Sequence, residues 1–228
     1  SSRRRHTRCN RWSRGLGDVY KRQSLLYAAA LFFALRWIDW PRLRDRAQQH
    51  VYLGSIVMLF FLWNLRIEIE PGFYWHLSAM VVFTLMFGWS LAVIGGSLAL
   101  LGIIVAGLNE WSGFLPSAIL CVLIPATLTQ MILGLVRAYL PKHFFVYVLV
   151  NAFLAGGLIF IIMALSITTG LLLMDSYSLA ELKSRFLIYL PMMVFPESML
   201  NGWIAAILVG FKPHWVGSFN DEEYIKGK

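Results

Sequence analysis

Two long runs without charge constrain the fold of this chain more than any other feature. Residues 77–108 and 144–174 contain no Asp, Glu, Lys or Arg. About 20 apolar residues in a helix are enough to cross the hydrocarbon core of a bilayer. Only 14% of the residues are charged, whereas a soluble domain carries about 25%. The runs do not alternate between apolar and polar residues, as the strands of a membrane β-barrel would. We therefore expect an all-α fold, a polytopic transmembrane helical bundle.

The apolar segments predict about seven transmembrane spans. As one helix, the run 77–108 would be about 48 Å long, too long for a single upright crossing, so we expect a break at Gly95 and Gly96. Pro125 is expected to kink the fifth span, because proline lacks a backbone N–H. Only six spans would remain if 97–108 were a re-entrant loop. The expected spans are 24–38, 47–65, 77–94, 97–108, 116–135, 144–174 and 186–210.

The distribution of Lys and Arg predicts the orientation of these spans. With seven spans, the loops 36–50 and 137–143 and the tail 211–228 share one side, and they hold most of the basic residues that follow residue 23. The opposite loops contain Arg66, Lys183 and Arg185. Basic residues accumulate on the cytoplasmic side of membrane proteins. We expect a multi-pass protein of the bacterial inner membrane with a cytoplasmic C-terminus and an outward-facing loop at 66–76.

Residues 1–23 differ in composition from the rest of the chain. They are rich in Arg and have no apolar core, which excludes a secretory signal peptide. A basic head can bind nucleic acid or anionic lipid, but this one resembles the translated sequencing adapters at the ends of metagenome-derived reading frames. We expect a non-native head, a missing authentic start and no nucleic-acid partner. The rest divides into a transmembrane helical domain at 24–211 and a cytoplasmic tail at 212–228.

Glu197 lies in the middle of the last expected span. An acid at the centre of a membrane helix costs at least about 2.5 kcal/mol, so Glu197 is expected to face the protein interior. Asn201 follows four residues later, on the same helix face. Pro191 and Pro196 are expected to break the helix and expose carbonyl groups near this carboxyl group. Two interpretations remain open: a polar element of a solute path or gate, and a structural carboxyl that locks helix packing.

His76 is the candidate metal ligand, since imidazole binds transition metals well. It follows an aromatic triplet at the expected membrane surface, where the alternative is a histidine hydrogen-bonded at headgroup level. Asn151 lies in an apolar run and is either part of a solute path or a hydrogen-bonding contact between helices. Cys121 lies alone in another apolar run, where a thiol acts as a small hydrophobic group. Together with Cys9 it predicts no disulfide framework.

Motifs for common enzyme chemistries are missing from the sequence. It contains no G-x-x-x-x-G-K-[ST] loop for nucleotide phosphates, no H-E-x-x-H zinc motif and no G-x-S-x-G nucleophile motif. We therefore expect no enzyme activity and no permanently bound cofactor. If the protein moves a solute uphill, the energy must come from a partner or from an ion gradient.

Several segments taken together resemble the CbiM-like family, the substrate-binding membrane components of energy-coupling factor (ECF) ABC transporters for cobalt and nickel. They are LRIEIEPGFYWHLSAMVVFTLMFG at 65–88, GGSLALLG at 95–102, LPKHFFVYVLVNAFLAGGL at 140–158 and RFLIYLPMMVFPESMLNG at 185–202. Within the family, the chain is most similar to a divergent bacterial branch of ECF transporter permeases. The resemblance implies an ECF substrate-component fold, transported Co²⁺ or Ni²⁺, and partners that comprise a transmembrane coupling subunit and cytoplasmic ATPase subunits.

The resemblance also implies a role for His76. In this family the metal is held by the free N-terminal amine, a histidine at position two and a histidine from a later segment, to which His76 corresponds by position. This chain has no Met-His start, and Trp75 and Leu77 flank the histidine in place of the usual Ser-His-Pro context. The expected function is that of a metal importer subunit. The alternatives are a membrane scaffold or assembly protein without a transported solute, and an ion-coupled carrier that uses Glu197.

Overall fold

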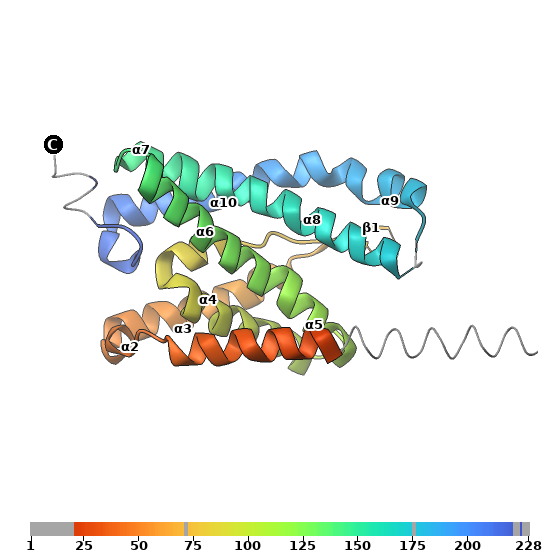
Figure 1. Cartoon of the computed structure of the whole chain (residues 1–228), viewed down its shortest axis with the longest axis horizontal. Coiled ribbons are helices and arrows are strands. Elements are labelled where there is room, and N and C mark those ends of the chain that lie inside the picture. The colour runs from red at the N-terminus through yellow and green to blue at the C-terminus, as the bar shows by residue number, and fades with distance from the viewer. Residues whose placement is uncertain (1–20, 71–72, 175–176, 221–223, 225–228) are drawn as a thin grey trace, which may run out of the picture.

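A computed structural model shows long helices that run side by side along one axis (Figure 1). It describes residues 21–70, 73–174, 177–220 and 224, and it leaves out the side chains of 68–70 and 73. Residues 1–20 of the expected head, and most of the tail beyond residue 220, lie outside the described residues. Residues 21–36 form the first described helix. The expected all-α bundle is confirmed.

The other elements follow in chain order. The first half contains α2 (Trp40–Arg44), α3 (Arg46–Asn64), β1 (Ile67–Glu70), β2 (Phe73–Trp75) and α4 (Met80–Val105). One long helical segment then comprises η1 (Trp111–Gly113), α5 (Phe114–Ser117), η2 (Ala118–Leu123) and α6 (Ile124–Tyr139), and the next comprises α7 (Phe144–Val146), η3 (Tyr147–Leu154) and α8 (Ala155–Leu173). The chain ends with α9 (Leu179–Arg185), η4 (Leu187–Tyr189), α10 (Leu190–Phe211) and η5 (Pro213–Trp215).

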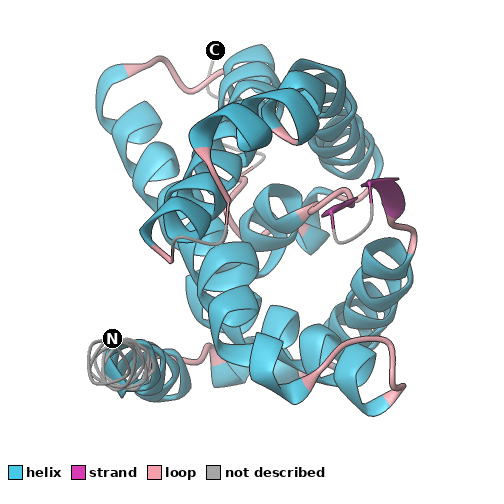
Figure 2. Cartoon of the chain, turned by 90° about the vertical axis from the view of Figure 1, so that its right-hand side faces the viewer, coloured by secondary structure: helices cyan, strands magenta, loops and turns pink. Residues whose placement is uncertain are grey.

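By length and composition, four helical segments among the described residues could each cross a membrane. They are Met80–Val105, which a kink at Gly88 divides into two helices, Trp111–Tyr139, Phe144–Leu173 and Leu179–Phe211. The two strands form a short antiparallel hairpin in which Ile67 pairs with Trp75. Figure 2 looks along the bundle and shows this hairpin at the near end, among the helix ends.

Helix α4 reverses direction at Gly88. This residue has φ 79° and ψ 171°, a combination that is essentially restricted to glycine. After the reversal, Gly95 lies against the ring of Phe83 and Gly96 against Met80, where added Cβ atoms would come within 2.7 Å and 3.3 Å of those side chains. The predicted break at Gly95 and Gly96 is wrong. Both glycines stay helical, and their lack of a side chain lets two helix segments pack closely.

Contacts at the two ends of the bundle show how many times the chain passes along it. At one end the Arg42 guanidinium donates to the Trp215 carbonyl over 2.8 Å and lies 5.4 Å from the centre of the Phe87 ring. At the other end Arg66 donates to the Leu108 carbonyl over 3.0 Å. Residues 76–87 therefore run along the bundle in one direction and residues 89–105 in the other. With this reversal, the described residues make seven passes along the bundle.

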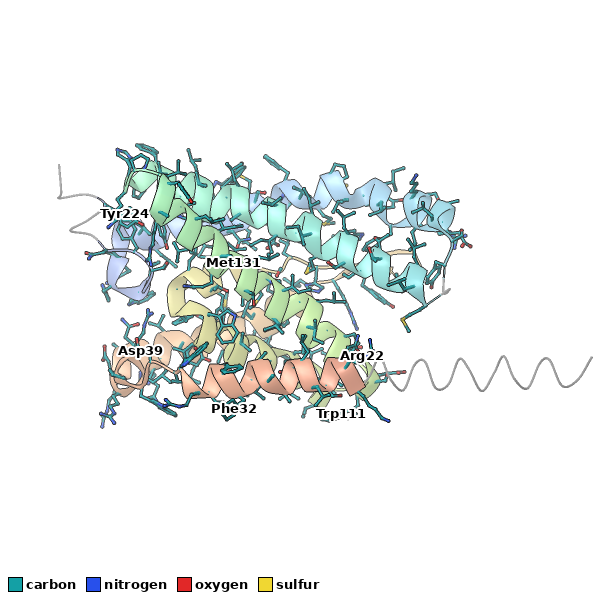
Figure 3. All side chains as sticks on the ribbon, viewed as in Figure 1. Arg22, Phe32, Asp39, Trp111, Met131 and Tyr224 are labelled. Atoms are coloured by element: carbon teal, nitrogen blue, oxygen red, sulfur yellow. The ribbon has the colours of Figure 1, made fainter. Side chains whose placement is uncertain are left out.

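The loops at each end are those that the sequence predicted to share a side. Arg137 donates to the Ser218 carbonyl at the end that holds α2. Trp75 stacks on Phe186, with ring centres 4.4 Å apart, at the hairpin end. Figure 3 shows the same division, with Asp39 and Tyr224 at one end and Arg22 and Trp111 at the other. We name the end with α2 and Arg137 the basic end, and the opposite end, with β1 and β2, the hairpin end.

The prolines do not interrupt the helices. The segment Trp111–Tyr139 is continuous, and the turn before Pro125 widens into the π-helical stretch η2. A π turn is one way to accommodate the missing N–H of proline. Helix α10 also continues through Pro196, and Pro191 lies in its first turn, where proline is tolerated. The predicted break of this helix is therefore wrong.

Candidate functional site

The site is built around the extended segment 76–79, which connects the hairpin to α4. The segment enters the bundle from the hairpin end, and its last residue, Ala79, has φ 52°. His76 is half-buried at its start, with Nδ1 3.2 Å from the Leu77 carbonyl oxygen and its ring 6.0 Å from that of Trp63. The Trp63 Nε1–H donates to the Ser78 carbonyl over 2.9 Å. The helix that the sequence predicted to start at Leu77 therefore starts three residues later, at Met80.

Glu197 closes the free N-terminus of α4. Its Oε2 accepts the Ser78 N–H over 2.7 Å, and its Oε1 accepts the Ala79 N–H over 2.9 Å. The first amides of a helix have no partner within the helix and carry partial positive charge. Ala79 has no side chain that could cap them. The carboxylate of α10 therefore acts as the cap, although Glu197 is only 1% exposed.

Asn201 completes this cap. Its Oδ1 accepts the Val82 N–H over 2.9 Å, and its Nδ2 donates to Glu197 Oε1 over 2.7 Å and to the Glu197 carbonyl over 2.8 Å. Gly156 of α8 makes room for Asn201, because a Cβ on that glycine would lie 3.1 Å from Nδ2. The structure thus brings Glu197 and Asn201 together as the sequence suggested. Glu197 binds the segment 76–79, which carries His76, and Asn201 binds the first turn of α4 that follows it.

Asn151 lies apart from this group. It is buried in η3, with 1% of its surface exposed. Within the described part of the chain, neither of its amide atoms has a hydrogen-bond partner. The same holds for Trp75 Nε1 and Ser78 Oγ, which flank His76 on either side. Unpaired buried polar groups are costly, so each one marks a place where a ligand or a water would be stabilised.

A cavity of about 300 Å³ adjoins His76 at the hairpin end. Its walls come from the hairpin, η2, α8 and the α9 region, and they are formed by Tyr74, Trp75, His76, Cys121, Met163, Ile167, Leu171, Tyr177 and Phe186. Three of these side chains, those of His76, Cys121 and Met163, carry a nitrogen or sulfur atom that can bind a metal.

Of these three, only His76 could be predicted from the sequence as a metal ligand, because a thiol and a thioether in apolar runs resemble ordinary packing groups. Among the described residues, no group of three or more His, Cys, Asp or Glu side chains could hold a metal ion. Any metal site at this cavity therefore needs ligands beyond these four residue types. The Glu68 and Glu70 side chains lie outside the description, although β1 confirms the extended backbone expected there.

The other end of the short helix 80–87 is also held by α10, through the tail that follows it. The Gly217 N–H donates to the Met86 carbonyl over 2.8 Å. The Ser218 N–H and Oγ both donate to the Leu85 carbonyl, over 3.2 Å and 2.6 Å. Helix α10 and its tail thus hold the short helix at its N-terminus through Glu197 and at its C-terminus through Ser218.

The fold and the site define a polytopic helical membrane protein with a discontinuous helix and a small cavity at one end. The sequence matches the model of the family CbiM, described as the cobalt uptake substrate-specific transmembrane region, over residues 22–215. The chain belongs to this family and is a transmembrane component of cobalt uptake, a kind of protein that works with other transporter components. No individual curated protein matches the sequence.

Proposed function

We propose that this protein is the substrate-binding membrane subunit of an ECF importer for a divalent transition metal, cobalt or nickel. Its membership of the CbiM family over residues 22–215 carries the proposal. The position of His76 beside a cavity supports it, because an imidazole is a suitable ligand for these metals. The proposed partners are a transmembrane coupling subunit and cytoplasmic ATPase subunits, which supply the energy. The chain itself is proposed to have no enzyme activity and no permanently bound cofactor.

The proposed orientation follows from charge. Arg42, Arg44, Arg137 and Lys212 lie at the basic end, and this excess favours the cytoplasmic side of a bacterial inner membrane. The tail is then cytoplasmic, and His76 and its cavity open toward the outside. Metal ions would enter at the hairpin end, and the ATPases would act from the basic end.

The residues of the site have distinct roles in this proposal. His76 binds the metal through an imidazole nitrogen. Glu197 and Asn201 position the backbone that carries His76, since Ser78 and Ala79 are fixed by Glu197. An extended segment has no internal hydrogen bonds to hold it, and a binding site needs its ligands fixed to within about 0.5 Å. Glu197 and Asn201, which cap α4, thus also hold His76 in position in this proposal.

The substitution His76→Ala tests the site. The expected result is a loss of at least about tenfold in cobalt affinity, measured by equilibrium binding to the purified protein. Removing a residue that only hydrogen-bonds a metal ligand already lowers metal affinity by about 10–100-fold. The matched control is His214→Ala, which removes an exposed imidazole at the basic end and should leave cobalt affinity unchanged. Unchanged affinity in His76→Ala would exclude this histidine as a ligand.

Two other functions predict different outcomes. A scaffold protein would bind no cobalt and would purify from native membranes without an ATPase. An ion-coupled carrier would take up solute without ATP and would need Glu197 as a protonatable group. Both oxygens of Glu197 already accept hydrogen bonds from the α4 N-terminus, and this weighs against the carrier.

A further inference from the structure

We propose that Cys121 and Met163 bind the transported metal together with His76, so that the cavity at the hairpin end is a site with nitrogen and sulfur ligands. This inference rests on the proposed function and adds the ligand set. It starts from one observation: three side chains with soft or borderline donor atoms, far apart in the sequence, line the same cavity of about 300 Å³.

The packing places the two sulfur atoms in the same region independently of the cavity. Cys121 packs against a buried cluster that contains Trp75, Met163 and Phe186. These residues come from η2, β2, α8 and the start of the last helical segment. The cluster therefore brings Cys121 to the hairpin, next to the residue before His76.

The cavity also has room for a metal ion. Metal–nitrogen bonds to histidine are about 2.0 Å long and metal–sulfur bonds to cysteine about 2.3 Å. A water molecule takes about 30 Å³ in the liquid, so a cavity of about 300 Å³ has room for an ion, a partial hydration shell and the movement of three side chains toward it. Trp75 Nε1–H, buried and without a partner in the described chain, also lines this cavity and is available to donate to a metal-bound thiolate or water.

The backbone at Cys121 is unusual in a way that supports a site. Cys121 lies in η2, a π-helical stretch between Ala118 and Leu123. Single π turns within α-helices are rare and often occur at functional sites. Cys121, within this stretch, lines the cavity.

The chemistry gives the site its selectivity. Thiolate and thioether sulfur prefer soft and borderline ions, whereas Mg²⁺ and Ca²⁺ prefer oxygen ligands. Cobalt(II) and nickel(II) fit a mixed set of one imidazole, one thiolate and one thioether. Metal binding would remove the Cys121 thiol proton, so that an S–H bond is exchanged for a metal–sulfur bond and one proton is released to solvent.

The test uses cobalt(II) with the full chain purified in detergent. The chain contains 2 cysteines, so Cys9→Ser leaves Cys121 as the only thiol and serves as the matched control. We expect Cys9→Ser to show a near-ultraviolet thiolate-to-cobalt charge-transfer band on cobalt binding. Cys121→Ser should lose this band and bind cobalt at least about tenfold more weakly. Met163→Leu, which nearly conserves volume, should keep the band with several-fold weaker binding.

The possible outcomes separate this inference from the proposed function. Cobalt binding that depends on His76 but shows no charge-transfer band would overturn the sulfur ligands and leave the proposed function intact. No cobalt binding by any variant would overturn both. Because Cys121→Ser could lose its fold, a second measurement uses the Cys9→Ser protein alone: cobalt, but not magnesium, should protect Cys121 from a thiol-reactive maleimide. Equal labelling with and without cobalt would reject the inference.

Discussion

Glu197 shows how a membrane protein can bury an acid without a basic partner. Three donors converge on its two oxygens: the N–H groups of Ser78 and Ala79 and the Asn201 amide. An ionised carboxylate only accepts hydrogen bonds, so donors on all sides suit it. The positive end of the helix dipole adds to this stabilisation. Glu197 thus connects α10 to the segment 76–79, which carries His76.

The substitution Glu197→Gln tests the hydrogen bonds between Glu197 and the segment 76–79. The amide group of glutamine would point N–H groups at the Ser78 or Ala79 N–H, leaving a buried donor without a partner. We expect a loss of about 1–3 kcal/mol in stability, measured by thermal unfolding in detergent, and weaker cobalt binding.

The control for this prediction is Glu110→Gln, because Glu110 is exposed and its Oε2 accepts from the nearby Ser112 hydroxyl at the surface. It should change neither property. Full stability and full cobalt affinity in Glu197→Gln, combined with loss of pH-driven uptake, would favour the ion-coupled carrier.

At the scale of residues, the sequence predicted which polar side chains are important. It did not predict which groups those side chains bind. Glu197 and Asn201 were paired because helical spacing puts them on one face. The partners of Glu197, Ser78 and Ala79, lie 119 and 118 residues away, and no local pattern encodes that contact. The sequence likewise did not predict that Cys121 and Met163 lie at one cavity, because only the folded chain brings them together.

At the scale of elements, the decisive feature is the discontinuous helix in residues 76–105. The sequence predicted two helices there from length, because one helix would exceed the bilayer. It placed the break at the glycine pair, the most flexible local sequence. The structure uses Gly88 for the turn, since that residue adopts a positive φ, and uses Gly95 and Gly96 for close packing. Composition alone does not distinguish a glycine needed for its backbone from one needed for its missing side chain.

The substitution Gly88→Ala tests where the turn lies. The space around Gly88 is open, with no atom within 4 Å of an added Cβ, so any loss would come from backbone strain of about 1–3 kcal/mol. We expect a lower unfolding temperature in detergent.

The matched control is Gly134→Ala, which also meets no atom within 4 Å but lies in regular helix. It should be neutral or stabilising by up to about 1 kcal/mol, because alanine favours helix. If both variants behaved alike, Gly88 would not be the turn.

At the scale of the molecule, the bundle has two chemically different ends, and the pass formed by residues 76–87 connects them. Glu197 holds the start of the helical part of this pass in the bundle interior, and Gly217 and Ser218 hold its last carbonyls near the basic end. Any movement of α10 relative to the bundle would thus reach both the tail and the segment of His76. The sequence predicted from the number of spans which loops share an end, and these groupings are confirmed. It could not predict that one segment ties the ends together, because that depends on tertiary hydrogen bonds.

The orientation of this bundle is the prediction on which the import model depends. Single cysteines would be placed at exposed positions in a Cys9→Ser, Cys121→Ala background, at Ser112 and Ser184 for the hairpin end and at Ala47 and Leu140 for the basic end. These four substitutions leave every Lys and Arg in place, so they do not disturb the charge asymmetry that sets topology. In intact cells a membrane-impermeant maleimide should label Ser112→Cys and Ser184→Cys, and label Ala47→Cys and Leu140→Cys only after permeabilisation. The reverse pattern would put the cavity on the cytoplasmic side, from which imported metal could not enter it.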